Sequence, residues 1–265
     1  MRKLRVVVCM KIVPKAEEVR VDPATRRLDR AGARSEINPP DMNALECALA
    51  LKDHYSAEVF VLSMGPPFFE PYLRLTLALG VDHVYLLSDR KFAGSDTLAT
   101  TYVLAQAIKT IGDVDVVLCG EESYDGSTGQ VPPGIAEWLD YPQLCMVHAV
   151  EYDPDRAVFI GVRRYQGVEE VIEARLPVVV SVRVQVNEPR FLDYRLRSRM
   201  EEPERLTVWS AEAIGAEDAF LGAQGSPTVV SGLESAETRE RRREIMKGRP
   251  DELARRLVDL VTERM

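Results

Sequence analysis

The stretch of residues 114–142 constrains the fold of this chain most strongly, because it combines an apolar run, a polar loop and a helix start. Residues 114–119, which are apolar except for Asp115, are typical of a strand buried on both faces of a sheet. The helix that follows the loop, which we expect to reach about Leu139, has two prolines in its first turn. Unpaired N–H groups and the helix dipole meet at such a helix start and favour an anion. The stretch therefore predicts a parallel strand that leads into a phosphate-binding loop.

The residue types of this loop suit phosphate binding. Gly126 and Gly129 allow a close approach of the backbone or a positive φ. Ser127 and Thr128 add hydroxyl donors, and the Gln130 amide can donate without adding a negative charge. An ordinary strand-to-helix loop with turn residues would have a similar composition, so residue chemistry alone leaves both interpretations open.

Strands and helices alternate along the first 150 residues. Apolar runs predict strands at residues 4–10, 58–63, 83–87, 114–119 and 144–150, and helical periodicity appears at residues 42–54, 72–79 and 97–111. This alternation predicts parallel strands with helices on both faces of the sheet. After residue 153, three β-rich segments with a turn at Gln166 and Gly167 predict a hairpin and a further strand that extend the sheet.

Ligands of such sheets bind at the carboxyl ends of the strands. The loops at those ends comprise residues 10–14, 63–67, 88–96 and 120–129, and we expect them to line one crevice. Cys9, near the end of the first strand, lies where a ligand would sit. Neither G-x-G-x-x-G nor G-x-x-x-x-G-K-[ST] occurs, which excludes a standard dinucleotide fold and a P-loop enzyme.

The composition limits the classes of partner that we expect the protein to bind and the compartment in which we expect it. The net charge of −8 opposes binding to nucleic acid or to anionic membranes, and we interpret the arginine-rich residues 239–243 as a solvated helix face. The four cysteines show no C-x-x-C spacing and the three histidines are scattered, so we expect core thiols and no metal site. With no apolar run near 18 residues and a first strand near the N-terminus, we expect a soluble, cytoplasmic protein.

Several motifs, in a shared order over about 180 residues, resemble the beta subunit of electron transfer flavoprotein. Residues 125–131 (Asp-Gly-Ser-Thr-Gly-Gln-Val) with residues 135–139 resemble the nucleotide-binding segment of that family. The resemblance extends over residues 11–14, 37–41 with 44–46, 63–66, 94–100, 176–180 and 187–190. It implies a Rossmann-like, adenine nucleotide hydrolase-like α/β fold, with a mostly parallel sheet, an antiparallel extension and a C-terminal arm.

The resemblance implies a nucleotide pocket and an electron carrier that works with an FAD-carrying alpha subunit. No catalytic side chain is demanded, because the flavin supplies the chemistry. The residues that we expect to bind the cofactor lie at the strand ends and on the phosphate loop: Cys9, Met10, Lys11, Asn38, Asp41, Met64, Gly65, Gly94, Asp96, Thr97, Thr100, Gly120, Asp125, Gly126, Ser127, Thr128, Gly129, Gln130 and Val131.

The identity of the cofactor depends on residues 94–100, which resemble the form found in flavin-bifurcating members. That resemblance favours FAD in the pocket, with NAD(H) as a transient substrate, and AMP is the alternative. Helix capping would equally explain Ser95 and Asp96, and it would also explain Asn38 and Asp41 at the preceding helix start.

Residues 191–203 resemble the loop that anchors the flavoprotein on its dehydrogenase or quinone oxidoreductase partner. Tyr194 and Leu196 are the expected partner contacts. The stretch is rich in arginine where the family is rich in lysine and small residues, which leaves the identity of the partner open.

We expect a nucleotide-binding domain at residues 1–203 and an arm at residues 204–265 that packs on the alpha subunit, because the latter part is charged and poor in core residues. Residues 210–220 are predicted to be partly helical, residues 227–230 strand-like and residues 250–263 an amphipathic helix. Two other classes stay open: an ATP-using enzyme such as an ATP pyrophosphatase, and a nucleotide-sensing stress protein.

Overall fold

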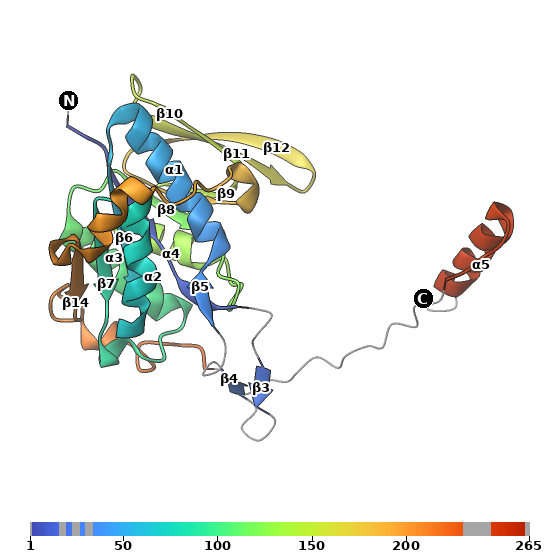
Figure 1. Ribbon diagram of the computed structural model, residues 1–265, viewed down its shortest axis with the longest axis horizontal. Coiled ribbons are helices and arrows are strands. Elements are labelled where there is room, and N and C mark those ends of the chain that lie inside the picture. Colours follow the sequence, from blue (N-terminus) through green and yellow to red (C-terminus); the bar gives the residue numbers. More distant parts are fainter. Residues whose placement is uncertain (1, 16–19, 23–26, 30–33, 230–244, 263–265) are drawn as a thin grey trace. The chain divides into compact units, whose positions relative to one another are not determined.

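The computed structural model describes residues 2–15, 20–22, 27–29, 34–229 and 245–262 (Figure 1). The chain divides into two compact units, Met1–Gly232 and Leu233–Met265. The arginine-rich residues 239–243 lie outside the described residues.

A parallel sheet forms the centre of the first unit. Within the described residues it has seven strands in the order β14-β7-β6-β1-β8-β13-β9. The strands are β1 (Arg5–Cys9), β6 (Glu58–Met64), β7 (His83–Leu87), β8 (Val116–Gly120), β9 (Gln143–Val147), β13 (Val178–Val182) and β14 (Leu206–Trp209). Strands β8 and β13 are buried at every position, because helices cover both faces.

Two hydrophobic cores lie on the two faces of this sheet. Helix α1 (Pro39–Tyr55) and α2 (Glu70–Arg74), which continues as the 3₁₀ segment η3 (Leu75–Leu79), pack against one face. Helices α3 (Thr97–Ile111) and α4 (Val131–Leu139) pack against the other. The alternation of residues along β1 explains this division, since Val6 and Val8 belong to the first core and Val7 to the second. The predicted α/β fold is confirmed.

The antiparallel strands form a sheet of their own. Strands β10 (Ala149–Asp153), β11 (Val158–Tyr165) and β12 (Val168–Arg175) pair in that order, and β11 and β12 join at the predicted turn, where Gln166 and Gly167 have φ of 49° and 82°. The expectation that this hairpin extends the central sheet was wrong, because only β13 joins that sheet. The hairpin packs by its inner face instead, and Phe159 is buried in the core of α1.

Residues 204–229 belong to the first unit. Strand β14 pairs in parallel with β7 at the edge of the central sheet, and Thr207 Oγ1 lies 2.8 Å from His83 Nε2. The compact unit therefore extends beyond the boundary expected at residue 203. Residues 210–220 contain turns and one 3₁₀ segment, as expected in part, but residues 227–229 form no strand. Their polar groups bind the loop before α3 instead, as described below.

Shorter elements complete the described chain. Strand β2 (Ile12–Pro14) pairs with β5 (Ser35–Ile37), and β3 (Arg20–Asp22) pairs with β4 (Arg27–Asp29). The 3₁₀ segments are η2 (Pro67–Phe69), η4 (Arg90–Phe92), η5 (Val184–Val186), η6 (Tyr194–Glu201), η7 (Pro203–Arg205) and η8 (Asp218–Phe220).

In the second unit, the described part contains helix α5 (Pro250–Thr262), as the sequence predicted. Its side chains Leu257, Val258 and Val261 are more than half exposed. No helix among the described residues is both long enough and apolar enough to cross a membrane.

Candidate nucleotide site

Asp41 joins the carboxyl ends of two neighbouring strands. Its Oδ2 accepts a hydrogen bond of 2.8 Å from the Lys11 N–H, just beyond β1, and its Oδ1 accepts one of 3.1 Å from the Gly120 N–H, at the end of β8. A Cβ on Gly120 would lie 2.5 Å from Asp41 Oδ1 and 2.6 Å from Pro40 Cβ. Glycine is therefore required at position 120, and the start of α1 is fixed against both strands.

The Asp41 carboxyl is 6% exposed. Burial raises its pKa from 3.8 to about 7, although the N–H donors of Lys11 and Gly120 and the Asn38 amide act in the opposite direction. Both oxygens of Asp41 thus accept hydrogen bonds from backbone N–H groups. Within the site its role is to shape the loops.

Asn38 shapes the loop that follows β8. Its Nδ2 donates to the Glu122 carbonyl at 2.9 Å, and its Oδ1 accepts from the Tyr124 N–H at 3.1 Å. Of the two N-cap candidates, Asn38 occupies the N-cap position of α1, but neither side chain makes a capping hydrogen bond. Both side chains are drawn instead to backbone partners about 80 residues away in the sequence.

Lys11 brings a positive charge to residues 121–130, the loop between β8 and α4 that the sequence predicts to bind phosphate and that is called the phosphate loop below. Its Nζ lies 2.6 Å from Asp125 Oδ1 and 3.4 Å from Ser123 Oγ, and almost half of its side chain is exposed. The loops after β1 and β8 therefore meet, as the topology predicted. The ammonium group of Lys11 lies within reach of an anion bound on this loop.

The phosphate loop leads directly into α4. Ser127 and Gly129 have φ of 48° and 62°, so one of the two positive values falls on a serine rather than on Gly126. Gly126, Ser127, Thr128 and Gln130 are exposed. Pro132 lies in the first turn of α4, as expected for a helix that begins at Val131. The loop therefore presents hydroxyl groups and a helix start to solvent.

The loop before α3 has other contacts. Asp96 caps α3 by accepting from the Ala99 N–H at 3.0 Å, as predicted. Its other oxygen accepts from Thr228 N–H at 3.0 Å and from Thr228 Oγ1 at 2.6 Å, while Ser226 Oγ accepts from the Asp96 N–H. Gly94 packs beside Ala223, with 3.2 Å between its built Cβ and that of Ala223. Residues 223–228 thus occupy much of the polar surface of this loop.

The remaining predicted site residues divide into buried and half-buried positions. The side chains of Cys9 and Met10 are buried in the two cores, and contact with Cys9 together with burial raises the pKa of the Cys119 thiol. Gly65 lies against the ring of Phe69. The side chains that are partly accessible at this edge of the sheet are Met64, Thr97, Thr100 and Val131.

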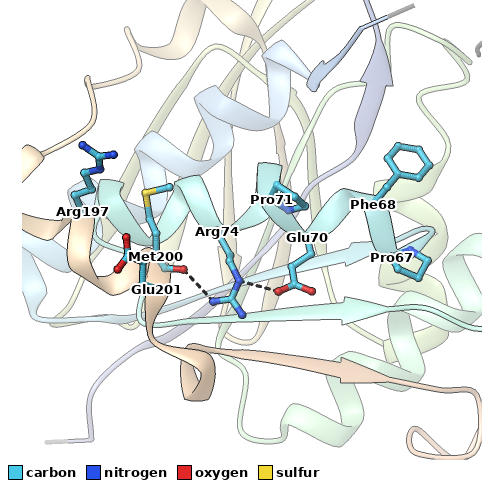
Figure 2. A pocket seen from close by; sticks show the side chains of 8 residues that line it. All are labelled: Pro67, Phe68, Glu70, Pro71, Arg74, Arg197, Met200 and Glu201. Atoms are coloured by element: carbon cyan, nitrogen blue, oxygen red, sulfur yellow. Dashed lines mark hydrogen bonds and ion pairs between the residues drawn. The ribbon is translucent and has the colours of Figure 1, made fainter. Parts of the chain in front are cut away.

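A separate groove of about 460 Å³ lies between α2 and η6 (Figure 2). Arg74 joins its two walls, since its Nε pairs with Glu70 at 2.8 Å and its Nη1 donates to the Met200 carbonyl at 3.1 Å. Phe68 is 59% exposed at one end of the groove. Of the two expected partner contacts on η6, Tyr194 is 80% exposed and Leu196 is half-buried.

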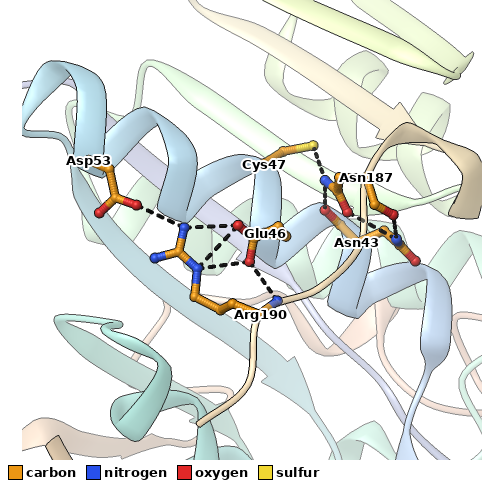
Figure 3. Close-up of polar contacts among 6 residues, drawn as sticks. All are labelled: Asn43, Glu46, Cys47, Asp53, Asn187 and Arg190. Carbon is orange, nitrogen blue, oxygen red and sulfur yellow. Dashed lines mark hydrogen bonds and ion pairs between the residues drawn. The ribbon is translucent and has the colours of Figure 1, made fainter. Parts of the chain in front are cut away.

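Two polar clusters fix the segment before η6 to α1 (Figure 3). Asn43 Nδ2 donates to the Asn187 carbonyl at 2.9 Å, and Asn187 Nδ2 donates to the Asn43 carbonyl at 3.0 Å. Arg190 donates to both oxygens of Glu46 and also pairs with Asp53 at 2.8 Å. Sequence reasoning missed these contacts. The available signal for such contacts was Asn43, a polar residue among the apolar positions of the predicted helix.

The fold defines an α/β protein with a parallel sheet whose loops gather at one carboxyl edge, an arrangement typical of nucleotide-binding proteins. Residues 25–213 match the electron transfer flavoprotein domain. The chain is 41% identical over 237 residues to the electron transfer flavoprotein subunit beta of Clostridium acetobutylicum, covering 89% of this chain and 90% of that protein. It therefore belongs to the electron transfer flavoprotein family, as a beta subunit.

Two further relatives have more specific names. The chain is 40% identical over 229 residues to the caffeyl-CoA reductase-Etf complex subunit CarD of Acetobacterium woodii, covering 86% of each chain. It is 43% identical over 235 residues to the protein FixA of Azorhizobium caulinodans, covering 86% of this chain and 83% of that protein.

Proposed function

We propose that this beta subunit binds FAD at the carboxyl edge of its sheet and, with an alpha subunit, passes electrons from NADH to downstream acceptors by flavin-based bifurcation. The observation that carries the proposal is the meeting of Lys11 with the exposed loop before α4. This donor set suits a pyrophosphate, because it combines an ammonium group, two hydroxyls and a helix start. Similarity to a subunit named for a reductase-Etf complex supports it.

The residues of this chain would bind and orient the cofactor. The N–H groups and hydroxyls of Ser127 and Thr128 would hold phosphate oxygens, and Lys11 would exchange its Asp125 partner for a phosphate or share the two. Asn38 and Asp41 would keep this loop in place. When bound, the flavin supplies the electron-transfer chemistry, while its potential depends on nearby hydrogen bonds and charges.

A non-bifurcating beta subunit that holds structural AMP is the second candidate, and one observation favours it. Both carboxylate oxygens of Asp96 already accept hydrogen bonds, from the Ala99 N–H and from Thr228. Residues 94–100 therefore offer fewer free groups to a second part of a dinucleotide than the sequence suggested. AMP needs the phosphate loop and room for its adenosine, and it has no second nucleotide part that would require residues 94–100.

Titration with NADH separates the two candidates. The chain would be purified with its alpha subunit under anaerobic conditions and mixed with NADH, and the yellow absorbance of oxidised flavin would be followed. We expect NADH to bleach it. Bleaching by dithionite but not by NADH would contradict bifurcation and favour the AMP-holding form.

We further propose that the second unit packs on the alpha subunit, and that the heterodimer works in the cytoplasm with a dehydrogenase or a quinone oxidoreductase as its redox partner. The exposed Leu257, Val258 and Val261 of α5 motivate this proposal. Deleting residues 233–265 should abolish co-purification with the alpha subunit. Retention of a stable heterodimer after the deletion would contradict it.

A further inference from the structure

Arg183 directly follows β13 and lies at the carboxyl edge of the central sheet. Its N–H donates to the Val147 carbonyl at 2.9 Å, and the preceding Val182 pairs with Gly120, the last residue of β8. The phosphate loop starts at Glu121, whose N–H donates to the Val182 carbonyl at 2.9 Å. Backbone hydrogen bonds therefore fix Arg183 beside the first residue of the phosphate loop.

The guanidinium group of Arg183 has free hydrogen-bond donors. Its Nε lies 3.3 Å from Glu121 Oε2 and is shielded from solvent, yet it donates no hydrogen bond. Within the part of the chain that the structure describes, the other two guanidinium nitrogens donate none either. The side chain is 38% exposed, so a ligand can reach it. Because polar groups at such positions normally have a partner, the free donors of Arg183 point to an acceptor from outside the chain.

Lys11 lies at one end of the exposed part of the phosphate loop. The Ser127 N–H donates to the Ser123 carbonyl at 2.7 Å, and Ser123 Oγ lies 3.4 Å from Lys11 Nζ. Ser127 and the following Thr128 are exposed. The hydroxyl groups expected to bind phosphate therefore begin next to the first cation.

Arg183 lies at the other end of this part of the loop. A Cβ built on Gly129 would lie 3.6 Å from the Glu121 carbonyl oxygen, so the loop returns at Gly129 to the residue that pairs with Arg183. Strand β8 separates β1 from β13, which places the backbone segments that carry Lys11 and Arg183 about 10 Å apart. The two long side chains can therefore approach one ligand on the loop from opposite sides.

We infer that Arg183 binds the second phosphate of a dinucleotide, while Lys11 binds the first. The inference rests on the function proposed above and deepens it, because it assigns a residue that distinguishes a pyrophosphate from a single phosphate. The pyrophosphate of FAD carries a negative charge on each phosphate, and each charge would meet one cation. A guanidinium group suits this role, since its planar donors match phosphate oxygens and form charge-assisted hydrogen bonds. Glu121 opposes the bound phosphate, because both are anions.

Arg183→Gln and Glu121→Gln together separate a contact with the ligand from a role in positioning the loop. We expect Arg183→Gln to weaken binding of ADP, which carries a pyrophosphate, about 10- to 100-fold and to change binding of AMP less than about 2-fold. Glu121→Gln should bind ADP at least as tightly as the parent, because it removes an anion that competes for Arg183. Arg164→Gln, on the exposed end of β11, is the matched control and should bind both as the parent does.

The measurement is calorimetric titration of the nucleotide-depleted heterodimer with FAD, ADP and AMP. An equal loss of affinity for ADP and AMP in Arg183→Gln would overturn the inference. Weak binding of ADP by Glu121→Gln, as weak as by Arg183→Gln, would also overturn it, because the ion pair would then only position the loop. If Arg183→Gln alone does not fold, the double variant removes both charges, and it must bind ADP more weakly than Glu121→Gln does.

The parent separates failure of the inference from failure of the proposed function. A parent that binds ADP but not FAD would contradict the proposed function, while the affinities of the variants for ADP would still decide the role of Arg183. A parent that binds AMP as tightly as ADP would overturn the inference. A parent that binds none of the three would contradict both.

Discussion

Replacement of Asp41 by asparagine tests how the site is built. In the parent both oxygens of the Asp41 carboxyl group accept backbone N–H groups, at 2.8 and 3.1 Å. Asparagine has one acceptor oxygen, so its amide group would face one of these N–H donors. A buried donor that loses its acceptor costs about 1–3 kcal/mol. We expect Asp41→Asn to lower the free energy of unfolding by that amount near pH 5 and to loosen the phosphate loop.

The raised pKa of Asp41 determines whether its contribution to stability rises or falls with pH. Because the pKa of Asp41 is raised from 3.8 to about 7, the folded protein retains a proton that the unfolded chain has released between these values. The contribution of Asp41 to stability therefore falls as the pH rises from about 4 to 7, by at most about 4 kcal/mol at about 1.4 kcal/mol per pKa unit. Asparagine does not titrate. The deficit of Asp41→Asn should thus shrink, and can reverse, across this range.

The assay is urea unfolding of the heterodimer, followed by tryptophan fluorescence at several pH values between 4.5 and 7.5. Asp140→Asn is the control: Asp140 is exposed at the end of α4 with φ of 56°, a conformation that asparagine tolerates. The difference in stability between Asp140→Asn and the parent should not show the pH dependence expected for Asp41→Asn. A deficit of Asp41→Asn that is constant across the range would refute the raised pKa, and no deficit at any pH would refute the bridging role.

Two further predictions concern the segment that carries η6. Arg190→Ala removes the contacts to Glu46 and Asp53, so amide hydrogens of residues 191–201 should exchange faster, as measured by mass spectrometry; unchanged exchange would contradict the positioning role. Tyr194→Ala combined with Leu196→Ala should slow electron exchange with the redox partner in stopped-flow assays and leave the flavin content unchanged. Loss of flavin from that variant would place η6 in the cofactor pocket.

The central sheet could be predicted because its signal is local. Continuous apolar runs such as residues 116–119 are explained by burial on both faces, and each loop then falls at a known edge of the sheet. Strand β14 was not predicted, because its four residues lie at the edge and are only partly buried. The separate antiparallel sheet was missed for a related reason: alternation identifies a hairpin but does not say which sheet it joins.

The turn composition of the loop before α4 could be predicted from the sequence, whereas the side chains that hold this loop in place could not. The glycines and hydroxyls of residues 126–129 are contiguous, whereas Asn38 and Asp41 act on backbone groups that only the fold brings near. Both looked like helix caps because capping is the local use of these side chains.

Counting cofactors tests the central claim most directly. The purified heterodimer would be denatured, and the released FAD and AMP would be quantified by chromatography for the parent and for Gly126→Leu. Position 126 accepts a side chain without backbone strain, because its φ is not positive and its built Cβ meets only Ser123 Oγ, at 3.3 Å. Thr110→Leu, on the exposed end of α3, is the control. We expect two FAD per parent heterodimer and one in Gly126→Leu, whereas one FAD with one AMP in the parent would contradict the account.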